Sequence, residues 1–286
     1  MGTVAALVLG SLMGMSAAGA QTYRVGGFTS AVTSTPGDWG WDGGQHTELR
    51  TALGSADYFG PTGIVATTIQ TVNLTDVAPS TLATVDCLVI PWVQDGDFTA
   101  DEIQAIRDFF LAGGDLFLLQ DGTDRDPIGE NLGIPTAGSS DGSISTGTPG
   151  GTPFFNGSFG TVAGVTQEGQ FGLLSEADIN TFNGTIAARN ASNQVTAALW
   201  GDGQYTAGAG KLVVLGDVDM ISGNFGAADY GPPIGNTNDK GRFGLNIFAF
   251  LATGGGGAAA PEPGAFALLG IGLVPLAAFL RRRPRG

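Results

Sequence analysis

Four aspartates are the side chains whose type and spacing could do chemistry. Asp121 and Asp124 follow one apolar run of the chain, and Asp217 and Asp219 follow another. If both runs are parallel strands, their carboxyl ends line one crevice, and the acids could converge on a divalent cation, which prefers oxygen ligands. Aspartate is also a common turn and capping residue after a strand. The structural role is the favoured interpretation, and a ligand or metal site at these four residues is the alternative.

A nucleophilic site would depend on Cys87 and His46, the single cysteine and the single histidine. Cys87 begins an apolar run, where a cysteine is usually an inert, small hydrophobic residue. His46 lies far upstream in "WDGGQHTELR", where it is expected to open a surface helix. The one Gly-x-Ser-x-Gly match, Gly138 to Gly142, falls in a stretch that is expected to be a loop, so no strand-to-helix nucleophile elbow is predicted. These residues argue against a nucleophilic hydrolase, and a single cysteine excludes an intrachain disulfide.

Aromatic residues gather in glycine-rich segments near the start of the chain. They are Trp39, Trp41, Tyr58 and Phe59. Exposed, such rings could stack on sugars; buried, they would cover a sheet, which is the commoner case.

The charge balance excludes one class of partner. The chain of 286 residues has a formal net charge of −14, and a body this acidic repels phosphate backbones. The sequence shows no phosphate loop, zinc-ligand spacing or dinucleotide fingerprint. Nucleic-acid binding is therefore not expected, and no cofactor is expected other than a divalent cation at the aspartates.

The elements that position these residues begin with three predicted strands, at 23–28, 63–72 and 86–93. A helix over 99–111 follows, with Thr99 and Glu102 spaced as a capping box. The next apolar run, 115–121, is predicted to be another buried strand. Strand, helix and strand joined by short turns form a crossover that requires a parallel sheet.

The second half of the body changes character. Residues 138–160 are rich in Gly, Ser, Thr and Pro and are predicted to be a long loop. Segments 181–191 and 195–204 are predicted to be an antiparallel pair at a sheet edge. A final buried strand over 211–217 precedes a C-terminal helix in 236–254. We therefore expect one α/β domain over residues 21–252, with a three-layer, flavodoxin-like, mostly parallel sheet and an antiparallel edge.

Three stretches resemble the class I glutamine amidotransferase-like superfamily, in particular its non-catalytic members. They are "DCLVIPWVQDGDFTADEIQAIRDFFLAGGDLFLLQDG", "FFNGSFG" and "GKLVVLGDVDMISGN…NIFAFLATG". The family's catalytic cysteine would stand at the elbow that here reads "QDGTD", where Asp121 replaces it. The resemblance therefore implies a body without amidotransferase activity.

The two ends of the chain predict a cellular address. Residues 1–20 are apolar and end in small residues at Ala18 and Ala20, as in a signal peptide cleaved before Gln21. Residues 253–260 form a glycine- and alanine-rich linker. Residues 264–280 carry no charge and are predicted to be a membrane helix, which basic residues stop on the cytoplasmic side. These basic residues are Arg281, Arg282, Arg283 and Arg285.

The tail, residues 261–286, begins with Pro261, Glu262 and Pro263. The tripeptide, the apolar span and the arginines together resemble the PEP-CTERM sorting signal, also described as an ice-binding-protein C-terminal domain. The resemblance implies a Gram-negative bacterium, an exosortase that processes a membrane-anchored precursor, and a final place at the cell surface or in the extracellular matrix.

Two functions from different classes remain open. The first is an exported, non-enzymatic protein whose α/β body binds polysaccharide or a protein partner. The alternative is a divergent, metal-assisted hydrolase that uses the strand-end carboxylates.

Overall fold

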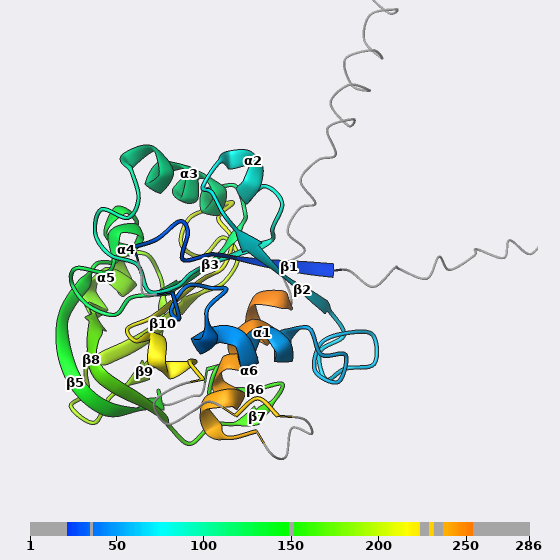
Figure 1. Ribbon diagram of the computed structural model, residues 1–286. Helices are drawn as coiled ribbons and strands as arrows, with labels where there is room; N and C mark the ends of the chain where they lie inside the picture. The colour runs from blue at the N-terminus through cyan, green and yellow to red at the C-terminus, as the bar shows by residue number, and fades with distance from the viewer. Residues whose placement is uncertain (1–21, 35–36, 149–151, 224–228, 232–236, 254–286) are drawn as a thin grey trace, which may run out of the picture.

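Nine strands form one sheet in the order β2-β1-β3-β4-β11-β10-β8-β5-β9. The structure, a computed structural model, describes residues 22–34, 37–148, 152–223, 229–231 and 237–253. The strands from β2 to β11 are parallel to one another, whereas β10, β8, β5 and β9 are paired antiparallel. Figure 1 shows these two halves at opposite ends of the molecule.

The parallel half is built from apolar runs. Its strands are β1 (Thr22–Phe28), β2 (Thr68–Leu74), β3 (Cys87–Ile90), β4 (Asp115–Leu119) and β11 (Leu212–Leu215). Every residue of β3, β4 and β11 is buried, as expected for parallel strands covered on both faces. The predictions of strands at these five places are confirmed, although β2 begins five residues later than predicted.

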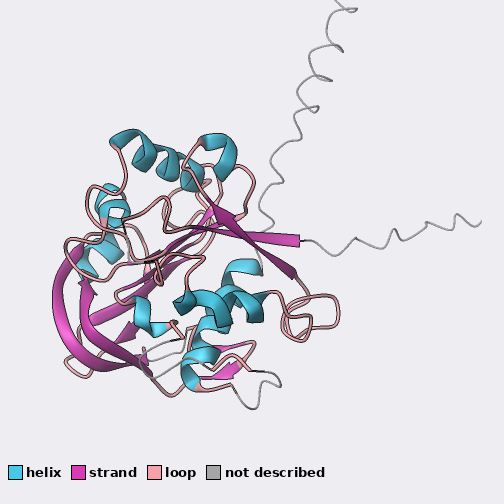
Figure 2. Cartoon of the chain, in the orientation of Figure 1, coloured by secondary structure: helices cyan, strands magenta, loops and turns pink. Residues whose placement is uncertain are grey.

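Helices cover both faces of this half (Figure 2). Side chains of α1 and α6 pack in one apolar core, and side chains of α2, α3 and α4 pack in the other. The helices are η1 (Gly44–His46), α1 (Thr47–Leu53), α2 (Pro79–Leu82), α3 (Ala100–Leu111), α4 (Pro127–Asn131), α5 (Glu176–Thr181), η2 (Val218–Met220) and α6 (Asp239–Ala252).

The predicted capping box at the start of α3 is present. The Thr99 side chain accepts from the Glu102 amide, and the Glu102 carboxylate accepts from the Thr99 amide at 2.8 Å. The helix over 99–111 and the C-terminal helix are therefore confirmed.

The antiparallel half closes on itself. Its strands are β5 (Thr136–Gly147), β8 (Val165–Leu174), β9 (Thr185–Arg189) and β10 (Val195–Trp200). β10 pairs with β8 and with β9, and β5 also pairs with both, so the four strands form a closed ring. A short hairpin of β6 (Asn156–Gly157) and β7 (Gly160–Thr161) contacts α6 beside it.

The prediction of a flavodoxin-like, mostly parallel sheet with an antiparallel edge is therefore wrong. Among the described strands of this sheet, five pairings are antiparallel and four are parallel. The error has a physical cause in β5, which was predicted to be part of a loop. β5 is rich in Gly, Ser and Thr, half of its residues are exposed and two are buried, so it lacks the apolar alternation that marks a strand. Its backbone pairs with β8, with two irregularities in the register.

The predicted membrane association is also corrected. In the part of the chain that the structure describes, no helix is long and apolar enough to cross a membrane. The predicted membrane helix 264–280, its stop charges, the sorting motif 261–263 and the signal 1–20 lie outside the described residues. The described residues therefore do not bear out the predicted membrane-anchored precursor or the predicted membrane partner.

Candidate functional site

The carboxyl ends of β1, β3, β4 and β11 meet at one edge of the sheet because these strands are parallel neighbours. The loop after β1 carries Trp39, and the loop after β3 carries Trp92. The loop after β4 carries Asp121 and Arg125. We call these four residues the strand-end site. β2 and β3 lie on opposite sides of β1, so the chain reverses its direction of progress across the sheet between β1 and β3. Such a reversal is where parallel α/β sheets bind ligands.

Asp217 and Asp219, predicted at this edge, hold the loop after β11. Asp217 is fully buried, and its two carboxylate oxygens accept from the amides of Asp219 (2.7 Å) and Glu168 (3.2 Å). Asp219 is also buried and accepts from the Ser222 hydroxyl at 2.8 Å. Both acids therefore fix the turn, as the structural interpretation expected.

Asp121 and Asp124 differ from this buried pair. Asp121 forms an ion pair with Arg125 at 2.7 Å, and its side chain is 13% exposed. The side chain of Asp124 is 74% exposed and lies 3.9 Å from Nε of Arg125. Asp121 thus belongs to the edge of the acidic cluster, and Asp124 belongs to the surface.

Burial raises the pKa values of the three clustered acids, and acidic neighbours add to each rise. Burial raises the pKa of Asp121 to about 7, Arg125 opposes this rise, and Asp219 and Asp124 add to it. Burial, then Asp219 and Asp121, raise the pKa of Asp217 well above its usual range. The pKa of Asp219 is raised by burial, against the effects of the Ser222 hydroxyl and Lys240. The structure therefore brings Asp121, Asp217 and Asp219 close enough to affect one another.

Two charged residues near the cluster were missed from the sequence. Lys240, in the first turn of α6, is buried, and burial lowers its pKa against the attraction of Asp219, Asp217 and Glu168. Glu168 lies in β8, which was not predicted to be a strand. Their neighbours are distant in sequence, so no local pattern could have indicated them.

The predicted divalent cation finds no ligand set here. Among the described residues, no three or more His, Cys, Asp or Glu side chains are placed to hold a metal ion. Backbone amides already occupy both oxygens of Asp217, and Arg125 pairs with Asp121. A cation shared by Asp121, Asp124, Asp217 and Asp219 therefore stays a prediction without structural support.

Two tryptophans stand beside the acids. The rings of Trp39 and Trp92 meet edge to face, with centroids 5.9 Å apart and planes at 77°. Both side chains are partly exposed, although they also pack against the apolar core. The Arg125 guanidinium lies 4.5 Å from the centre of the Trp92 ring. A continuous row of contacts therefore runs from Asp121 through Arg125 and Trp92 to Trp39.

The other predicted sugar-stacking aromatics are core residues. Trp41, Tyr58 and Phe59 are at most 2% exposed. Of the four aromatic residues singled out in the sequence, only Trp39 reaches the surface. Trp92 was missed because 86–93 was predicted to be one buried strand, whereas β3 ends at Ile90.

His46 and Cys87 do not form a nucleophilic pair. His46 directly precedes α1 but is fully buried, so the expected surface position is wrong. Burial, then Arg50, lowers the pKa of His46 to about 4. Cys87 is fully buried at the opposite edge of the sheet, and burial raises the pKa of its thiol.

Comparison with known proteins shows the fold and no family. No family model matches the chain, and no curated protein matches it. The solved structure described as "mmIFT52 N-terminal domain" has a TM-score of 0.52 and 16% identity, over 82% of this chain and 98% of that one. The cytoplasmic protein STM1381 from Salmonella typhimurium LT2 has a TM-score of 0.50 and 12% identity, over 80% of this chain and 100% of that one. At these identities the likeness concerns the fold alone.

These findings correct both predicted resemblances. The similar structures include the two domains named above and no glutamine amidotransferase is named among them, so the assignment to the glutamine amidotransferase-like superfamily is wrong. The PEP-CTERM resemblance is not supported by any family model, and its residues lie outside the described part of the chain. The exosortase partner and the cell-surface address that depended on this resemblance are withdrawn with it.

Proposed function

We propose that this is a non-enzymatic binding protein that holds a polysaccharide at the strand-end site. The observation that carries the proposal is the edge-to-face pair of Trp39 and Trp92, partly exposed at the edge where the parallel strands end. Sugar rings present apolar C–H faces that pack on indole rings, and a tryptophan held in place by packing loses little conformational freedom on binding.

The polar neighbours suit the hydroxyl groups of a sugar. Asp121 accepts hydrogen bonds and Arg125 donates them, and the ion pair between them fixes both groups beside Trp92. A few convergent polar groups next to an apolar surface are what a small-molecule site needs for orientation. The two indole planes lie at 77°, so one ring can face a sugar while the other bounds its edge.

The electrostatics favour a ligand without negative charge. The chain has a net charge of −14, and acidic neighbours already add to the raised pKa values of Asp121 and Asp217. A phosphate- or sulfate-rich polymer would add repulsion to this edge. A neutral polysaccharide adds no such repulsion, and its hydroxyl groups can donate hydrogen bonds to Asp121, which is partly exposed.

A glycan screen with the full-length protein tests the proposal. We expect a neutral glycan to bind, and Trp92→Ala or Trp39→Ala to weaken binding by roughly 10- to 100-fold, as loss of about 1.5–3 kcal/mol of aromatic burial implies. Ile144→Ala removes an apolar side chain that is 58% exposed in the antiparallel half, and this control should bind like the wild type. Equal affinities in all four proteins would refute the assignment of the site.

Hydrolysis by carboxylates is the second candidate, favoured by one observation. Burial raises the pKa of Asp121 to about 7, and Asp217 beside it is more deeply buried. Two neighbouring carboxyl groups in unlike environments have different pKa values, so one can act as a general acid and the other as a general base. Metal-dependent turnover in a broad substrate screen, lost in Asp121→Asn and Asp217→Asn proteins that still fold, would establish this function in place of binding alone. Turnover that survives both substitutions would rule out these carboxylates.

A further inference from the structure

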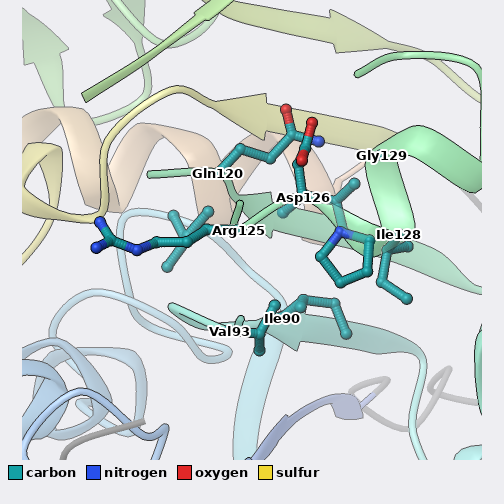
Figure 3. A pocket seen from close by; sticks show the side chains of 10 residues that line it. Ile90, Val93, Gln120, Arg125, Asp126, Ile128 and Gly129 are labelled. Atoms are coloured by element: carbon teal, nitrogen blue, oxygen red, sulfur yellow. The ribbon is translucent and has the colours of Figure 1, made fainter. Parts of the chain in front are cut away.

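A small pocket beneath the loops that follow β3 and β4 is lined in part by Arg125 of the strand-end site (Figure 3). Its empty volume of about 180 Å³, which includes the part that is open to solvent, is smaller than that of an ordinary ligand pocket. A sugar therefore cannot enter this pocket and would have to lie over the partly exposed rings of Trp39 and Trp92. The placement of these two rings then decides the affinity, and so do the groups that hold their loops.

Arg50, in α1, holds the loop that carries Trp39. Its guanidinium donates hydrogen bonds to the carbonyls of three consecutive residues of this loop. They are Trp41, Asp42 (3.1 Å) and Gly43 (3.2 Å). None of the ion pairs among the described residues includes Arg50, so its donors serve the backbone of the loop rather than a carboxylate.

The shape of the arginine side chain suits this set of bonds. A guanidinium is planar and presents several N–H donors in a fixed fork, whereas the ammonium of lysine is a single point on a flexible stem. Arg50 also donates to Oγ1 of Thr47 at 3.1 Å, and this hydroxyl donates to the Gly43 carbonyl at 3.2 Å. The guanidinium lies 5.9 Å from the centre of the fully buried Trp41 ring. Arg50 and Thr47 therefore join the loop to α1 at one place.

The residues that Arg50 binds fix the backbone on both sides of Trp39. The Gln45 amide donates to the carbonyl of Asp38, which directly precedes Trp39, at 3.1 Å. Gly43 packs so closely on Asp38 that a Cβ atom at position 43 would lie 2.3 Å from the Asp38 carbonyl oxygen. The contact between Gly43 and Asp38 thus connects Arg50 to the backbone of Trp39.

We propose that Arg50 is a positioning residue of the strand-end site, which keeps Trp39 edge to face against Trp92 by holding the loop. The inference rests on the proposed function, because it assigns Arg50 a part in the affinity for a neutral glycan. A loop that is already ordered loses little conformational freedom when a ligand binds. Without Arg50, the ordering of Trp39 would have to accompany binding and would weaken it.

Near-ultraviolet circular dichroism of the full-length protein measures the placement of Trp39 without any ligand. The signal of Trp39 is the difference between a protein and the same protein with Trp39→Phe. We expect Arg50→Lys to lose most of this signal. Arg107→Lys is the matched control, because Arg107 in α3 donates to the Asn131 carbonyl at 2.6 Å, and it should keep the signal. An unchanged Trp39 signal in Arg50→Lys would overturn the proposal.

Titration of the neutral glycan that binds best in the screen then measures the effect on binding. We expect Arg50→Lys to weaken the affinity by about 2- to 10-fold, and Arg107→Lys to bind like the wild type. Loss of the Trp39 signal with unchanged affinity would overturn the role of Arg50 in binding. If the wild type binds no glycan, the proposed function fails, whereas loss of the Trp39 signal in Arg50→Lys would still support the placement of Trp39 by Arg50.

A milder variant decides the question if Arg50→Lys does not fold. Thr47→Val removes an exposed hydroxyl that binds both Arg50 and the Gly43 carbonyl, and it keeps the shape of the side chain. We expect a smaller loss of the Trp39 signal in this variant, which would support the proposal. An unchanged signal would overturn it.

Discussion

The amino-terminal and carboxyl-terminal edges of the parallel half, where its strands begin and end, contain similar groups that differ in their hydrogen-bond partners and charged neighbours. At the amino-terminal edge, Asp115 is buried and Lys211 lies over Phe250, with Nζ 5.5 Å from the ring centre. At the carboxyl-terminal edge, Asp121 is largely buried and Arg125 lies 4.5 Å over Trp92. Each edge therefore joins an acid, a cation and an aromatic ring.

The difference lies in what compensates the acid. Asp115 accepts from the Tyr23 hydroxyl and, at 2.6 Å, from the Lys211 amide. Burial raises its pKa to about 6, Tyr23 and Lys211 oppose this rise, and Asp202 makes the smallest contribution, which adds to it. Asp121 has Arg125 as a partner but also has Asp219 and Asp124 as repelling neighbours. At the amino-terminal edge, groups of the protein itself donate hydrogen bonds to the buried acid. At the carboxyl-terminal edge, acidic neighbours repel Asp121 and two tryptophan rings are partly exposed. A ligand there could reduce the repulsion and cover the rings.

The largest expected effect is on the free energy of unfolding, and it comes from a substitution at the amino-terminal edge. Asp115→Ala leaves the Tyr23 hydroxyl and the Lys211 amide buried without an acceptor, and should lower the free energy of unfolding by about 3–5 kcal/mol. Urea unfolding at pH 8 measures this change. A loss below about 1 kcal/mol would show that the amino-terminal edge does not depend on Asp115.

The next effect concerns Lys211. Its Nζ donates to the carbonyls of Leu251 (2.7 Å) and Thr253 (2.8 Å), which closes the end of α6. Lys211→Met keeps the aliphatic stem but removes both hydrogen bonds, and should cost about 2–3 kcal/mol in urea unfolding. Amide hydrogen exchange should increase in the last turn of α6, and unchanged exchange there would contradict this role.

At the other edge, removing the charge should stabilise the protein at high pH. The pKa of Asp121 is raised in the folded protein, so the folded state binds the proton more tightly, and wild-type stability rises as pH falls through about 7. Asp121→Asn lacks this titration. Its advantage over the wild type should be up to about 4 kcal/mol at pH 8, should shrink as pH falls below 7, and should vanish only near pH 4, where the unfolded carboxyl group is protonated as well. An advantage that is independent of pH would contradict the raised pKa.

The smallest expected effect on the free energy of unfolding comes from an exposed acid beside the cluster of Asp121, Asp217 and Asp219. Asp124→Asn changes a side chain that is 74% exposed, and its unfolding free energy should stay within about 0.5 kcal/mol of the wild type. The same urea titration checks this value, with Asp121→Asn as the comparison. A larger change would mean that Asp124 also belongs to the interacting acids.

The sequence made the parallel half predictable and the antiparallel half largely not. Buried parallel strands leave continuous apolar runs, and the capping box of Thr99 and Glu102 marks the start of α3 directly. β5 and β8 pair through backbone hydrogen bonds while exposing many polar side chains, so their composition resembles that of a loop.

The site was predicted only in part, for a similar reason. Aspartates after strands are visible in a sequence, so Asp121, Asp217 and Asp219 could be named. Trp92, Arg125 and Lys240 matter through contacts between loops that are far apart along the chain. Only the three-dimensional arrangement shows that Trp39 and Trp92 form a pair and that Trp41 does not reach the surface.

We expect the carboxyl-terminal edge of the parallel half to bind a ligand and the amino-terminal edge not to bind one. The most direct test is calorimetric titration of the best-binding neutral glycan into wild type, Trp92→Ala and Phe250→Ala, which removes the matching ring at the opposite edge. We expect roughly 10- to 100-fold weaker binding for Trp92→Ala and unchanged affinity for Phe250→Ala. Equal affinities in all three proteins, or a loss confined to Phe250→Ala, would show that the ligand does not bind at Trp92.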